Sequence, residues 1–103
     1  MPFNLVVSDT ADHSIDDILS YIDKELKNSV AALSWLDRLE MLFEKLVNHP
    51  EMFPLAKDPR IAVKGIRVAP LDNYVIAYKA NGADETVFIV NVFYGGRDYE
   101  KYL

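Results

Sequence analysis

The stretch ETVFIVNVFYG, residues 85–95, decides the fold of this chain. It is rich in β-branched and aromatic residues, which favour extended structure, and its middle is apolar at consecutive positions. Because successive residues of a strand point to opposite faces of a sheet, this pattern predicts a central strand that is buried on both sides. The rest of the chain should therefore supply neighbouring strands and a covering layer of helices.

Two neighbouring strands are predicted directly before this stretch. NGAD (residues 81–84) opens with Asn-Gly, a strong signal for a β-hairpin, and YVIAYKA (residues 74–80) comes before it as a partner strand. KGIRVAP (residues 64–70) is a further strand, joined to YVIAYKA by the turn LDN. These segments predict a mostly antiparallel sheet.

Side chains of the predicted strand at residues 64–70 point alternately to the two faces of the sheet, and this alternation indicates the face on which its arginine lies. Ile66 and Val68 point to one face, and Arg67 and Ala69 point to the other. If Ile66 and Val68 pack against helices, Arg67 lies on the open face of the sheet. We therefore expect Arg67 to be available to a ligand.

The covering layer comes from the first half of the chain. Apolar residues recur at helical spacing from Ile15 to Leu26, and Asn28-Ser29 interrupts them. A second helix is predicted from Val30 to Asn48, where His49-Pro50 ends it. Its apolar stripe consists of Leu33, Leu36, Leu39, Leu42 or Phe43, Leu46 and Val47, widened by Trp35 and Met41. Such an αα-hairpin needs a sheet to cover its apolar face.

The segment PFNLVVS (residues 2–8) is rich in β-formers and is predicted as a first strand. The predicted order is β-α-α-β-β-β, with an N-terminal helical hairpin packed on a mostly antiparallel sheet. This is an α+β fold. The 103 residues are expected to form a single domain, residues 1–103.

Composition narrows the class of function. There is no cysteine, no apolar run long enough to span a membrane and no signal-peptide pattern, so we expect a soluble, cytoplasmic protein without membrane contact. The net charge is −5, with −6 in residues 1–56 and +1 in residues 57–103. This balance predicts weak non-specific phosphate binding. A local basic patch is still expected where Lys57, Arg60 and Lys64 cluster, and these are the candidate nucleic-acid contacts.

Common catalytic motifs are missing. The sequence has no phosphate-binding glycine loop, and its two histidines, His13 and His49, are not spaced as metal ligands, so no metal or other cofactor is predicted. The strongest polar cluster joins Arg67 to Arg97 and Tyr99 near the end of the chain. Two arginines beside a tyrosine could hold a phosphate. In the alternative interpretation the arginines are solvated or paired with nearby acids, and Tyr99 packs the tail onto the sheet.

The order of these elements resembles the toxins of the RelE/ParE superfamily, the toxin half of bacterial type II toxin–antitoxin modules. The resemblance lies in NHPEMFPLAKDPR (residues 48–60), KGIRVAPLDNYVIAYKA (residues 64–80) and ETVFIVNVFYGGRDYEKYL (residues 85–103). It implies a cytoplasmic toxin that a cognate antitoxin wraps and holds inactive, by helix-in-groove or strand-addition binding. Trp35 is then a candidate anchor for the antitoxin, or else a core residue.

The resemblance implies one of two targets. RelE-like members cleave mRNA in the ribosomal A site without a metal, and in such an enzyme Arg67 and Arg97 would stabilise charge while Tyr99 stacks or transfers a proton. ParE-like members bind and block DNA gyrase. Val75 and Val68 occupy positions where RelE-like nucleases carry basic residues, which favours the gyrase inhibitor. A third alternative is a non-toxic binding module that keeps the fold without activity.

Overall fold

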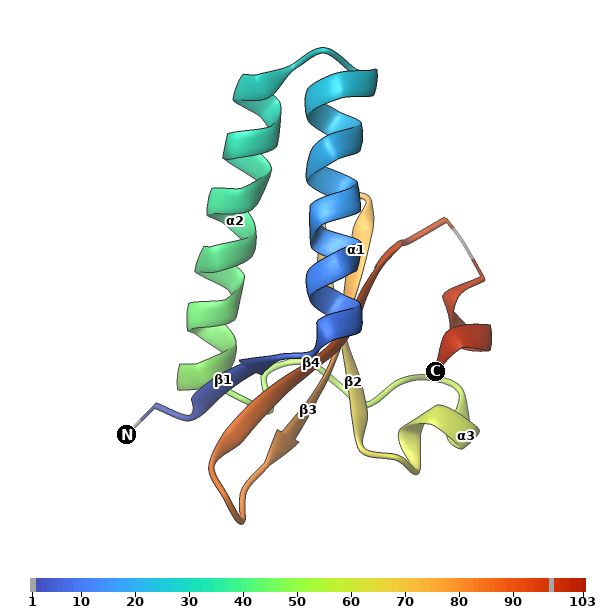
Figure 1. Ribbon diagram of the computed structural model, residues 1–103. Helices are drawn as coiled ribbons and strands as arrows, with labels where there is room; N and C mark the ends of the chain where they lie inside the picture. Colours follow the sequence, from blue (N-terminus) through green and yellow to red (C-terminus); the bar gives the residue numbers. More distant parts are fainter. Residues whose placement is uncertain (1, 97) are drawn as a thin grey trace.

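The computed structural model describes residues 2–96 and 98–103 (Figure 1). Its elements are β1 (Asn4–Val7), α1 (Asp9–Ser20), a π-helical turn (Tyr21–Glu25), α2 (Ser29–Asn48), α3 (Pro59–Ala62), β2 (Ile66–Leu71), β3 (Tyr74–Asn81), β4 (Thr86–Tyr94) and a 3₁₀ turn (Tyr99–Tyr102). The strands form one sheet in the order β1-β4-β3-β2, and β1 runs parallel to β4 while the other pairs are antiparallel. The predicted α+β fold is confirmed.

Ser8 fixes the start of α1 and ties it to the sheet. Its Oγ accepts a hydrogen bond from the backbone N–H of Ala11 at 3.0 Å, as a helix N-cap does. The same hydroxyl donates to the carbonyl of Val90 in β4 at 2.8 Å. Val90 is the extra residue of a β-bulge, because Ala77 pairs with Asn91 while the next residue of β3 pairs with Ile89.

The end of the first helix differs from the prediction. Its last turn is π-helical, and the N–H of Leu26 donates to the carbonyl of Tyr21, five residues earlier. The wider turn rotates Leu26 off the apolar face, so that its side chain is exposed. Asn28 then caps α2 by accepting a hydrogen bond from the N–H of Ala31 at 3.0 Å.

The helical hairpin covers one face of the sheet, and Figure 1 shows α1 and α2 running side by side. The buried residues of α2 are Ala32, Trp35, Leu39, Leu42, Phe43 and Leu46. The prediction that Leu33 and Met41 belong to the apolar stripe of this helix is wrong, because Leu33 is 65% exposed and Met41 is 60% exposed. At about 100° per residue, both positions lie far around the helix from the centre of the arc that the buried residues occupy, and they therefore point to solvent.

The opposite face of the sheet has a smaller core of its own. Ile61 of α3 packs there with Ile66, Ala77 and Phe93, and the tail adds Tyr99 and Leu103 to this cluster. Strand β4 is thus an interior strand, as predicted, but this second layer does not reach all of it. Phe88 remains partly exposed beside Val6 of β1, so the predicted burial on both sides holds for only part of β4.

Candidate functional site

Strand β2 has the predicted alternation with its two faces exchanged. Ile66 belongs to the small core away from the hairpin, whereas Ala69 belongs to the core beneath the helices. Arg67 pairs with Tyr78 of β3 and therefore lies on the helix-covered face. The expectation of an open-face Arg67 is wrong, because alternation separates two faces without telling which one meets the helices.

Arg67 fastens the segment that follows α2. Its Nη1 donates to the carbonyl of Phe53 at 2.7 Å, and its side chain is partly buried. Beside it, the hydroxyl of Tyr78 donates to the carbonyl of Pro50 at 2.9 Å. Burial raises the pKa of the Tyr78 phenol, which keeps its proton available for this bond. The two side chains hold residues 50–53 against the sheet, a structural role.

Tyr99 lies on the other side of the sheet. Its ring stacks on Phe93, with centroids 5.8 Å apart and an interplanar angle of 23°. The ring of Tyr102 also lies against Phe93, at 6.0 Å. The sheet therefore separates Tyr99 from Arg67, so these two predicted catalytic residues do not meet. Arg97, the third predicted catalytic residue, lies outside the described residues.

The predicted basic contacts surround α3. Arg60 and Lys64 line a hollow of about 570 Å³ together with acidic residues of the tail, Asp98 and Glu100. Arg60 Nη2 pairs with Asp58 Oδ2 at 2.9 Å, and this contact holds the pKa of the Asp58 carboxyl below its usual value. Lys64 Nζ donates to the carbonyl of Leu103 at 2.6 Å. The mixed charges make this a weak attractor for phosphate.

Lys57 points to a neighbouring hollow. It lines a depression of about 360 Å³ with Val68 and Tyr99, on the face of the sheet away from the helical hairpin. Of the three predicted basic contacts, Lys57 is thus the one that lines the same hollow as Tyr99. No ion pair involving Lys57 is found within the described residues.

Trp35 is a core residue, one of the two placements left open by the sequence. It is 2% exposed and packs edge to face with Tyr74, with ring centroids 5.4 Å apart. Its Nε1 has no hydrogen-bond partner among the described residues. A side chain with so little surface cannot anchor a partner in this conformation, and we correct the antitoxin-anchor interpretation accordingly.

A tyrosine-lined pocket was missed by sequence reasoning. Tyr21, Tyr74 and Tyr94 line a hollow of about 420 Å³ with Asp17 and Ile18. Tyr74 and Tyr94 are paired across β3 and β4 and meet edge to face, with centroids 5.9 Å apart. Burial raises the pKa of Tyr74, and the neighbouring phenols of Tyr21 and Tyr94 add to the shift. The register of β3 with β4 brings the rings of Tyr74 and Tyr94 together, and no local sequence motif indicates this arrangement.

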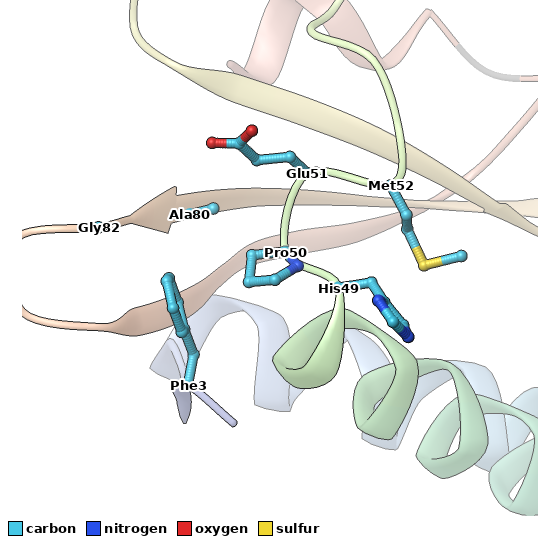
Figure 2. Close-up of a pocket in the computed structure, with 7 residues that line it drawn as sticks. All are labelled: Phe3, His49, Pro50, Glu51, Met52, Ala80 and Gly82. Carbon is cyan, nitrogen blue, oxygen red and sulfur yellow. The ribbon is translucent and has the colours of Figure 1, made fainter. Parts of the chain in front are cut away.

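A fourth hollow, of about 490 Å³, lies where α2 ends (Figure 2). Figure 2 shows that its lining comes from separate parts of the chain: Phe3, the segment after α2, and the end of β3 with its turn. His49, exposed at the C-cap of α2, and Glu51 are its titratable residues. None of the predicted site residues lines it.

The family assignment rests on a match over most of the chain. Residues 5–99 match the family of ParE toxins of the parDE type II toxin–antitoxin system. This chain belongs to the ParE toxin family.

Solved structures share the fold of this ParE-family toxin at low sequence identity. One is the RelBE2 toxin–antitoxin complex of Mycobacterium tuberculosis, with a TM-score of 0.64 and 16% identity, covering 91% of this chain and 99% of the other. Another is a mutant of the Escherichia coli toxin RelE in the free state, with a TM-score of 0.66 and 15% identity, covering 99% and 92%. No curated protein sequence matches the toxin.

The described residues of the ParE-family toxin contain neither a cluster of metal-ligating side chains nor a membrane-spanning helix. Throughout the described residues, no group of three or more His, Cys, Asp or Glu side chains could hold a metal ion. Within the same part of the chain, no helix combines the length and the apolar character that crossing a bilayer requires.

Proposed function

We propose that this toxin stops growth in the cytoplasm by inhibiting DNA gyrase, and that a cognate antitoxin neutralises it. The observation that carries this proposal is the separation of Arg67 from Tyr99 by the sheet, in a chain that belongs to the ParE toxin family. The proposed activity is binding, without covalent chemistry by the toxin itself.

Chemical requirements support this choice over RNA cleavage. Attack of a 2′-hydroxyl on the adjacent phosphate needs a base, an acid and cations that converge on one phosphorus centre. On the face that holds Tyr99, strand β2 contributes the apolar Val68, and Val75 of β3 lies beside the same cluster. Arg67, on the opposite face, is occupied by the carbonyl of Phe53.

A second candidate is a RelE-like, ribosome-dependent and metal-independent mRNA endoribonuclease. It is favoured by the hollow that Lys57 and Tyr99 line together, with Arg60 and Lys64 close to Lys57 in the chain. The predicted role of Arg67 in stabilising charge does not fit this candidate, because Arg67 lies on the other face of the sheet and is bonded to the carbonyl of Phe53. Lys57 would stabilise charge on the phosphate instead, and Lys57→Ala is then expected to abolish toxicity while the protein stays folded.

The antitoxin part of the proposal has separate support. The RelBE2 structure is a toxin–antitoxin complex with the same fold. In the present chain the helical hairpin exposes large apolar side chains that a wrapping segment could cover: Tyr21, Leu26, Val30, Leu33 and Met41. Exposed apolar side chains of this kind could supply the apolar part of a protein-binding surface.

The deciding experiment uses purified toxin freed of its antitoxin and shown to be folded by circular dichroism. The expected result is loss of DNA supercoiling by gyrase, restored by added antitoxin, with intact mRNA on programmed ribosomes in primer extension. New 5′ ends in A-site codons, lost in Lys57→Ala but kept in the control Lys79→Ala, would instead establish the nuclease. A folded protein that affects neither target nor growth would establish the non-toxic binding module.

A further inference from the structure

We propose that the pocket formed by Tyr21, Tyr74, Tyr94 and Asp17 binds the guanidinium group of an arginine presented by a partner protein. The inference rests on the proposed function only for the source of that arginine, which we assign to the antitoxin. The binding chemistry itself follows from the pocket.

The pocket is assembled from two pairs of residues. Asp17 and Tyr21 stand one turn apart at the end of the first helix, so both side chains lie on the same helix face. Tyr74 and Tyr94 pair directly across the ends of β3 and β4. Three phenol rings and one carboxylate thereby surround a hollow of about 420 Å³.

This lining suits a cation. The faces of tyrosine rings carry negative charge density and attract ammonium and guanidinium groups, as the aromatic cages of methyl-lysine readers do. Asp17 adds a carboxylate on the exposed rim, and the five lining residues described here include no basic side chain. The outer surface of the same helix carries further exposed acids, Asp9, Asp12 and Asp16, whose field attracts positive charge to this side of the molecule.

Arginine fits this lining better than lysine does. A planar guanidinium stacks on an aromatic face and at the same time presents parallel N–H donors to a carboxylate. An ammonium group is a compact, strongly hydrated charge that gives up more hydration on entering such a pocket. Tyr21 and Tyr94 are 51% and 54% exposed, so the pocket can be reached from solvent.

The direct test is an NMR titration of the whole toxin, labelled with ¹³C in its tyrosine rings, using N-acetyl-arginine-N-methylamide. The neutral, nearly isosteric N-acetyl-citrulline-N-methylamide is the control ligand. We expect saturable shifts of the Tyr21, Tyr74 and Tyr94 signals with arginine only. Tyr99, on the other side of the sheet, serves as an internal reference that should not shift.

Matched variants separate the pocket from general electrostatics. Asp17→Asn and Tyr94→Leu are each expected to weaken arginine binding by roughly three- to tenfold. Asp12→Asn removes the same charge from the same helix outside the pocket, and it should weaken binding less than twofold. Unchanged circular dichroism shows that each variant is folded.

Several outcomes would overturn the proposal. Equal shifts with arginine and citrulline would show that the pocket does not recognise charge. If Asp12→Asn weakened arginine binding as much as Asp17→Asn does, the attraction would come from the general negative charge of the helix and not from the pocket. Tighter binding of tetramethylammonium than of the arginine amide would identify a small-molecule ammonium site instead. None of these results depends on toxicity, so a failure of the gyrase assay remains distinguishable. If arginine binds, Tyr94→Leu should also weaken the complex with the co-purified antitoxin.

Discussion

Arg67 and Tyr99 lie on opposite faces of the same sheet. The guanidinium of Arg67 is bonded to the carbonyl of Phe53 on the helix side, and the ring of Tyr99 is stacked on Phe93 on the other. A single phosphate cannot touch both groups while β2, β3 and β4 keep this arrangement. The two residues should therefore act independently.

A double-mutant cycle measures that independence. We expect Arg67→Ala to lower the free energy of unfolding by about 1–2 kcal/mol, because a carbonyl loses its charged donor. Tyr99→Ala should cost about 1–2 kcal/mol through the lost aromatic stacking and burial. In urea titrations, the loss of unfolding free energy in the double variant should equal the sum of the two single losses within about 0.5 kcal/mol. A coupling energy above about 1 kcal/mol would show that they share a site.

Trp35 should behave as a core residue. Trp35→Ala is expected to lower the free energy of unfolding by about 3–5 kcal/mol, which is a large part of the stability of a domain of this size. Leu33→Ala on the same helix is the matched control, and it should change stability by less than about 0.5 kcal/mol because Leu33 is exposed. Thermal unfolding of both variants makes the comparison, and similar losses would contradict the burial of Trp35.

Tyr78 should make the protein sensitive to alkali. Its pKa is raised by burial above the ordinary value of 10.0, so the unfolded state loses the phenolic proton first as the pH rises. The stabilisation is complete below about pH 10 and is lost as the pH rises towards the folded pKa. Tyr78→Phe should cost about 1 kcal/mol at pH 7 through the lost bond to Pro50.

Urea unfolding at pH 7 and at a pH just above 10 measures this sensitivity. The alkaline loss of stability should be smaller for Tyr78→Phe than for the parent protein. Identical pH profiles for the parent and Tyr78→Phe would exclude Tyr78 as the source of the sensitivity.

Ser8 should stabilise the protein beyond the contribution of an ordinary helix cap. Ser8→Ala removes the acceptor for Ala11 N–H and the donor to the Val90 carbonyl, and we expect a loss of about 1–2 kcal/mol. Ser8→Thr keeps a hydroxyl and should recover most of it. Chemical denaturation of the three proteins provides the measurement. If Ser8→Ala unfolds like the parent protein, the bond to the bulge contributes nothing.

The parts of the fold that depend on local chemistry could be predicted from the sequence. Asn28 caps α2, His49-Pro50 ends it, and Asn81-Gly82 opens the hairpin between β3 and β4, because each residue acts on its own backbone or that of its neighbours. The order of the elements followed from these signals and from the apolar periodicity. The α+β class followed in turn.

The parts that depend on distant contacts could not be predicted. The alternation at Ile66 and Arg67 was correct, but the choice of face is made by α2 and α3 together. A single inserted residue in β4, Val90, also shifts the pairing with β3 midway along the strand. The tyrosine pocket depends on the register of β3 with β4 and on a π-helical turn, so neither Tyr74 nor Tyr94 stood out in the sequence.

The parallel pair of β1 and β4 has a consequence for synthesis in the cell. Ser8, next to β1, is bonded to a residue 82 positions later, so the sheet cannot be completed until the ribosome has made β4. Contacts this distant in sequence form late, because closing the long intervening chain costs entropy before the contact forms. Before β4 is made, a nascent toxin therefore has its helices, the strand β1 without its partner and the pair β2–β3, and the complete sheet forms only after translation has passed residue 94. Under the proposed neutralisation, an antitoxin already present would meet the toxin while its sheet is still incomplete.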